Sequence, residues 1–122
     1  VIGQAPLTIA DVAHNVDGMR TVNGMLLRTP HDRLRIVLGM VNDKDIDTVL
    51  ALLPKNAAYH FCKADIPRGM DADVLRQKAE QLGLLGTSHG SVAEALSTAR
   101  EQADANDLVL VTGSVFVVAE AL

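Results

Sequence analysis

The feature of this sequence that most limits its fold is a regular alternation of short apolar runs with segments of helical periodicity. A continuous apolar run is typical of a parallel strand that is covered on both faces. Apolar residues spaced three and four apart indicate one face of a helix instead. Strands are therefore predicted at residues 7–11, 34–39, 57–62, 84–87 (a short one at most) and 108–113.

Helical periodicity follows each of these runs. The predicted helices begin near residues 16, 46, 71, 91 and 115. Polar residues that could cap the first four are Asn15 or Asp17, Asp43 or Asp45, Asp71, and Ser91, which starts an S-x-x-E capping box. Strands that alternate with helices predict βαβ crossovers and a largely parallel sheet. We therefore expect a single three-layer α/β/α domain over residues 1–122.

Composition excludes some classes of function. Net charge is −4 and aromatic residues make up 2% of the 122 residues, so the chain offers neither a basic stripe nor a stacking platform for nucleic acid. No apolar stretch is long enough to predict a membrane span. The single cysteine, Cys62, cannot form an internal disulfide, which favours a cytoplasmic location. The first residue is Val1 rather than Met, and we expect the chain to belong to a longer polypeptide.

Polar clusters follow three of the predicted strands, where ligands bind in open α/β sheets. They are Asp11 with His14 and Asn15, the segment 39–45, and the segment 112–114. His14 could donate to a phosphate or carboxylate oxygen, and Asp11 could accept from a ribose hydroxyl, an ammonium group or water on a metal. The structural alternative is that each cluster only caps a strand end or a helix.

Other chemical signals are weak. The sequence contains no G-x-G-x-x-G, no P-loop and no G-x-S-x-G elbow, so a bound nucleotide would need most of its phosphate cradle from elsewhere. His60 and Cys62 share one face of a predicted strand. Two ligands do not make a zinc site, and burial accounts for both residues, so no metal site is expected here.

Four stretches in order carry a resemblance to a known family. They are DVAHNVDG at 11–18, VLGMVNDKD at 37–45, PRGMDADVL at 67–75 and LVLVTGSVFVVAEAL at 108–122. Together they resemble the C-terminal domain of the folylpolyglutamate synthase/dihydrofolate synthase family, which belongs to the wider Mur ligase group. Two positions depart from the family pattern: Val16 stands in place of Pro, and Gly69 in place of Ala.

The resemblance implies both a fold and an activity. The fold would be Rossmann-like with six strands, one of them antiparallel and supplied by residues 1–3. In the full enzyme, an N-terminal ATPase domain would bind ATP and Mg²⁺, and ATP would phosphorylate the carboxylate of dihydropteroate or a folate. The amine of L-glutamate would then attack the acyl phosphate. This domain would close over the ATPase domain and would be inactive alone.

The resemblance also implies roles for individual residues, although no residue here is assigned to catalysis. Asp11, His14 and Asn15 would lie by the nucleotide, with Asp11 toward the ribose and His14 also near the incoming glutamate. Further expected glutamate contacts are Ser114, Phe116 and, less strongly, Arg68; Lys44 is a weaker candidate still.

Two other functions fit a domain of this size and class. A phospho-receiver domain would need an acidic pair after the first strand, an Asp after the third and a Lys after the fifth, whereas here the first strand ends in Asp11 alone and the last in VTGS. A non-catalytic ligand-binding or interface module is the second alternative.

Overall fold

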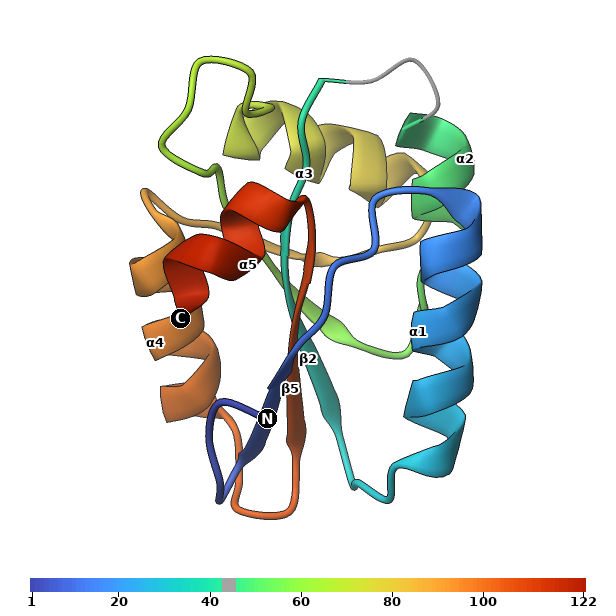
Figure 1. The fold of residues 1–122 in the computed structure, drawn as a ribbon, viewed down its shortest axis with the longest axis vertical. Helices are drawn as coiled ribbons and strands as arrows, with labels where there is room; N and C mark the ends of the chain where they lie inside the picture. The colour runs from blue at the N-terminus through green and yellow to red at the C-terminus, as the bar shows by residue number, and fades with distance from the viewer. Residues whose placement is uncertain (43–45) are drawn as a thin grey trace.

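The computed structural model describes residues 1–42 and 46–122, which form a parallel sheet with helices on both sides (Figure 1). The strands are β1 (Leu7–Ala10), β2 (Leu34–Gly39), β3 (Ala58–Phe61), β4 (Gly86–Ser88) and β5 (Leu108–Gly113). The helices are α1 (Val16–Arg28), α2 (Ile46–Ala51), α3 (Ala72–Gln81), α4 (Val92–Gln102) and α5 (Val115–Ala121). The predicted alternation of elements is confirmed, with β4 two residues later than expected.

The sheet has the order β1-β5-β2-β3-β4, and all of its neighbouring strands are parallel. The expectation of six strands is wrong by one, because the antiparallel strand expected at residues 1–3 is reduced to a single bridge between Gly3 and Thr8. A turn at residues 4–6 brings Gly3 back to Thr8, and the N–H groups of Ile2 and Gly3 both donate to the Thr8 carbonyl, at 2.7 and 3.3 Å.

Two hydrophobic clusters cover the two faces of the sheet. The larger one holds buried residues of α1, α2 and α3, including Met19, Val49 and Leu75. The smaller one holds those of α4 and α5, including Ala95 and Val117. This is the predicted three-layer arrangement, and the apolar spacing of each helix accounts for which face it buries.

The ends of the helices follow their local sequence. Asp71 accepts hydrogen bonds from the N–H groups of Asp73 and Val74 and so caps the start of α3. Gly83 follows the end of α3 with a φ of +84°, a conformation that cannot continue a helix. The helix predicted to begin near residue 46 ends at Ala51, shortly before Pro54, which disfavours helical geometry at the residue before it. The alternative caps Asp43 and Asp45 lie outside the described residues.

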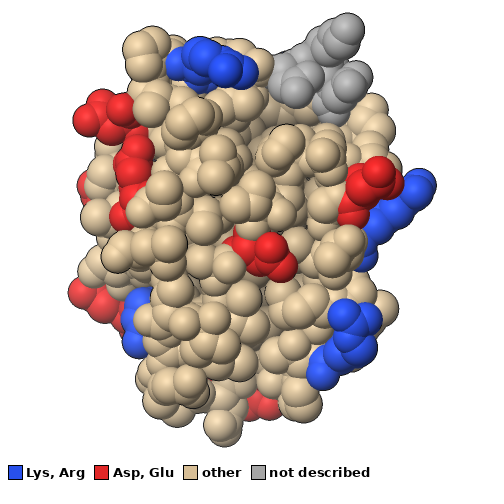
Figure 2. All heavy atoms as spheres, in the orientation of Figure 1, with Lys and Arg blue, Asp and Glu red and all other residues tan. Residues whose placement is uncertain are grey.

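On the face drawn in Figure 2, charged side chains of the described residues are scattered singly or in small groups among uncharged atoms, without a basic stripe. None of the helices in the described ranges is long and apolar enough to cross a membrane.

Candidate functional site at the carboxyl edge of the sheet

The loop that follows β1 is held against the end of β5 by its backbone. The N–H of Asp11 donates to the Val111 carbonyl at 3.0 Å, and the N–H of Ala13 donates to the Gly113 carbonyl at 3.1 Å. The Thr112 hydroxyl donates to the Asp11 carbonyl at 2.8 Å. These contacts fix the main chain around Asp11 without using its half-buried carboxylate.

The start of α1 lies directly beyond this loop. The side chain of Asn15 accepts a hydrogen bond from the Gly18 N–H at 2.8 Å, so Asn15, rather than Asp17, is the cap. His14 immediately precedes the cap and is exposed. An anion that approached this end of α1 would meet the positive end of a 13-residue helix dipole together with an accessible imidazole.

A glycine turn joins β5 to α5. Gly113 has a φ of +111°, and a Cβ at this position would overlap the Gly39 carbonyl, so β2 and β5 can approach this closely only with glycine here. The N–H of Ser114 donates to the same Gly39 carbonyl at 3.0 Å. The Ser114 hydroxyl is buried and accepts from the Val117 N–H at 3.3 Å, while Phe116 is 41% exposed.

Arg68 lies on a segment that packs beside the end of β2. Its carbonyl accepts a hydrogen bond from the Asn42 N–H at 3.1 Å, and the adjacent Gly69 forms an isolated bridge with Val41. The Arg68 side chain is exposed. The weaker candidate Lys44 lies outside the described residues.

The sheet order therefore brings most of the predicted site residues to one edge (the upper end in Figure 1). Since β5 lies between β1 and β2, the Asp11 loop and the Ser114 turn are direct neighbours, and the Arg68 segment lies beyond β2. The side chains are unequal in access: Asp11, His14, Phe116 and Arg68 reach solvent, whereas Ser114 is enclosed and Asn15 is used in capping. Whether any of them binds a ligand stays a prediction.

His60 and Cys62, weighed above as a metal pair, have separate surroundings. The Cys62 thiol is buried beside the Leu38 carbonyl at 3.6 Å, and burial raises its pKa to about 12. The partner of His60 is His89, with 3.2 Å between His60 Nδ1 and His89 Nε2. Sequence reasoning missed this pair, because neither residue stands in a recognisable motif.

Three hollows lie at the opposite, amino-terminal edge of the strands. Their volumes are about 480, 500 and 370 Å³, and Asp32 borders all three. They share no residue with the predicted site.

Comparison with known proteins gives the chain a family. The sequence profile described as Mur ligase, glutamate ligase domain matches residues 1–115. A probable bifunctional folylpolyglutamate synthase/dihydropteroate synthase of Haloferax volcanii is 43% identical over 122 residues, which are 99% of this chain and 15% of that protein.

Solved structures agree with the profile. E. coli FolC in complex with DHPP and ADP matches with a TM-score of 0.88 and 34% identity over 98% of this chain and 28% of that one. A bifunctional folylpolyglutamate synthase/dihydrofolate synthase with Mn, AMPPNP and L-glutamate bound matches with a TM-score of 0.86 and 31% identity over 99% of this chain and 29% of that one. The chain thus spans less than a third of the length of these relatives. These matches rule out the phospho-receiver alternative, because they place the chain in a different family. This chain belongs to the Mur ligase glutamate ligase domain family.

Proposed function

We propose that this chain is the C-terminal domain of an ATP-dependent ligase that adds L-glutamate to dihydropteroate or a folate. The chain belongs to the glutamate ligase domain family, and two similar structures hold ADP or AMPPNP, one of them together with L-glutamate. We place the ATPase domain on the N-terminal side of the same polypeptide and the enzyme in the cytoplasm, for which the single cysteine is the support.

The observation that carries this proposal is the edge formed by the Asp11 loop and the Ser114 turn. Asp11 and His14 come from the connection after β1 and Phe116 from the last helix, α5, yet the order β1-β5-β2 gathers them at the carboxyl ends of neighbouring parallel strands. This is where α/β domains bind ligands. The edge is open to solvent, as expected for half of a site that a second domain completes.

The exposed groups of this edge suit the two ligands of such a reaction. His14 and the start of α1 can donate to phosphate or carboxylate oxygens. The Asp11 carboxylate can accept hydrogen bonds from a ribose hydroxyl or from the glutamate ammonium group. In the reaction, ATP phosphorylates a substrate carboxylate, and the glutamate amine then displaces phosphate to form the amide.

We place the ligands of Mg²⁺ mainly in the ATPase domain, as the resemblance implies. Residues 1–42 and 46–122 contain no group of three His, Cys, Asp or Glu side chains arranged to hold a metal ion. The donors at this edge fit a role in orienting substrates, with Mg²⁺ bound mainly by the ATPase domain. Domain closure would then exclude water from the acyl phosphate.

Replacement of Asp11 in the full-length enzyme tests this assignment. We expect Asp11→Asn to lower kcat/KM for ATP or glutamate by about tenfold, because the acceptor keeps its place but loses its charge, and a charge-assisted hydrogen bond in a closed site becomes a weaker neutral one. Steady-state kinetics with each substrate varied in turn would measure the change.

Asp104→Asn is the matched control, because Asp104 is an exposed carboxylate between α4 and β5, at the opposite, amino-terminal edge of the sheet. This variant should keep kcat/KM for ATP and kcat/KM for glutamate within about twofold of the parent values. Equal activity of the Asp11→Asn variant and the parent would remove this edge from the substrate site and would favour the non-catalytic interface module.

A further inference from the structure

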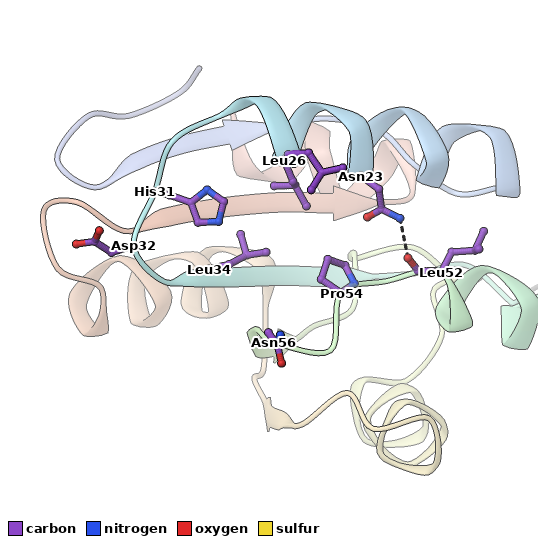
Figure 3. Close-up of a pocket in the computed structure, with 9 residues that line it drawn as sticks. Asn23, Leu26, His31, Asp32, Leu34, Leu52, Pro54 and Asn56 are labelled. Atoms are coloured by element: carbon purple, nitrogen blue, oxygen red, sulfur yellow. Dashed lines mark hydrogen bonds between the residues drawn. The ribbon is translucent and has the colours of Figure 1, made fainter.

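A hollow of about 480 Å³ lies between the last turns of α1, the start of β2 and the loop from α2 to β3 (Figure 3). It belongs to the amino-terminal edge of the sheet, away from the site proposed above. Its volume is within the range of small-molecule sites in proteins.

The walls of the hollow are mainly apolar. Leu26 and Leu34 lie between its two ends, with Pro54 on the side of the α2–β3 loop (Figure 3). Leu27 also lines it and is 89% exposed, whereas Leu26 and Leu34 are buried. A flat apolar body would replace water on these surfaces, which is the main favourable term for small ligands.

One end of the hollow holds an amide with an unused acceptor. The Asn23 Nδ2 donates to the Leu52 carbonyl at 2.7 Å, which orients the amide. Its Oδ1 is buried and has no hydrogen-bond partner in the structure. This oxygen is closed to solvent, so a ligand donor would reach it only after a shift of the amide, and would then offset the free energy that an unpartnered buried acceptor costs.

The other end holds two further acceptors, His31 and Asp32 (Figure 3). The His31 Nδ1 lies 2.7 Å from the Thr29 carbonyl. Since a carbonyl only accepts, Nδ1 is the donor, and Nε2 of the neutral ring is left as an acceptor. Among the described residues that line the hollow, Asp32 contributes the only formal charge, and this charge is negative.

We propose that this hollow binds a small organic cation: a flat apolar body with an amine or amidine group directed to Asp32 and His31. The apolar walls select the body, and acceptors at both ends with one carboxylate select donors and positive charge. The site is independent of the ligase activity, because it shares no residue with the Asp11 edge.

Benzamidine is a suitable probe, because it combines a flat ring with an amidinium group. At about −0.3 to −0.5 kcal/mol per non-hydrogen atom, a probe of nine such atoms should bind with a Kd on the order of 1–10 mM. Titration of the ¹⁵N-labelled chain, followed by amide NMR shifts, would measure this. Saturable shifts are expected at Asn23, Leu26, Leu27 and Asp32. Benzoate, with the same shape and opposite charge, should give no saturable shift.

Variants at exposed positions separate binding from folding. Leu27→Lys places a cation on the lining and should weaken benzamidine at least about tenfold, and Asp32→Asn should weaken it about three- to tenfold. Thr21→Lys adds the same charge at an exposed position of α1 that does not line the hollow, so it should leave the Kd unchanged.

Three results would overturn the proposal. One is the absence of saturable shifts at tens of millimolar benzamidine, and another is equal binding of benzoate. The third is a shift pattern centred on Ala105 and Asn106, which together with Asp32 border the adjacent hollow of about 500 Å³. Since the titration needs no turnover, it gives its answer whether or not the ligase assignment holds.

Discussion

His60 is a buried imidazole whose hydrogen bonds determine its tautomer. The Arg35 guanidinium, a donor only, lies 3.3 Å from His60 Nε2, so Nε2 is the acceptor. His60 Nδ1 then carries the proton and donates to His89 Nε2 at 3.2 Å. On one side, Arg35 also donates to the Gln102 side-chain oxygen at 3.1 Å. On the other side, the Glu94 carboxylate lies 3.9 Å from His89 Nδ1. The neutral form of His60 is the one that satisfies these contacts.

Acid should therefore destabilise the domain through His60. Burial, with smaller contributions from His89 and Arg35, lowers the pKa of His60 from 6.5 to about 4. The unfolded chain binds the proton more tightly than the folded one, so this contribution to stability is complete above about pH 6.5 and is lost as the pH falls to about 4. We expect the free energy of unfolding to fall by about 1–3 kcal/mol across this window.

Urea unfolding at several pH values measures this effect. His60→Gln should flatten the dependence between pH 6.5 and 4, since the titrating group is gone. His14→Gln removes an exposed imidazole and should keep the parent's slope. Identical slopes for the parent and the His60 variant would show that His60 is not the group responsible.

At the scale of elements, α4 shows how a short motif acts in its tertiary setting. The Ser91 side chain accepts from the Glu94 N–H at 3.0 Å, which confirms the serine half of the predicted capping box. The Glu94 carboxylate lies 3.9 Å from His89 Nδ1. The helix is thus capped by Ser91 and placed next to the imidazole pair by the same turn.

Loss of the Ser91 cap should destabilise the domain. Ser91→Ala leaves an N–H of the first turn of α4 without its side-chain acceptor, which costs about 1 kcal/mol. Ser97→Ala, at an exposed position within α4, should be neutral or slightly stabilising, because alanine is the better helix former. Thermal or urea unfolding of the two variants would measure the difference, and equal stability would mean that the cap contributes nothing.

For the whole molecule, the contrast is between a closed core and an open edge. Both faces of the sheet are covered by helices of this chain, so the apolar core needs no second domain. The carboxyl edge ends in exposed His14 and Phe116 and half-buried Asp11. Folding and activity should therefore be separable in this protein.

The 122-residue chain should unfold in a single cooperative transition and should form no amide from ATP, glutamate and dihydropteroate. Phosphoryl transfer depends on positioned charges and excluded water, and an open edge provides neither. A radiolabelled glutamate assay measures the product, with the full-length enzyme as the positive control. Turnover by the chain alone would show that the site is complete without the ATPase domain.

Much of the fold could be predicted because its signals are local. Apolar runs such as 108–113, caps such as Asp71 and the stop at Gly83 depend on residues close in sequence, so they identified the strands, the helix starts and the three layers. The sixth strand was wrong because residues 1–3 pair with β1 at a single bridge, between Gly3 and Thr8, and the pairing of two segments is not a local property of either.

The sequence by itself determined the alternation of strands and helices, the buried faces and the family motifs, since each follows from periodicity or from residue types a few positions apart. Only the tertiary structure decided that β5 lies between β1 and β2, so that residues about a hundred positions apart, Asp11 and Thr112, meet at one edge. It also decided that His60 pairs with His89 and that a hollow with acceptors at both ends opens beside α1. The physical reason is that strand order and side-chain neighbours depend on how all the elements pack at once, which no local stretch specifies.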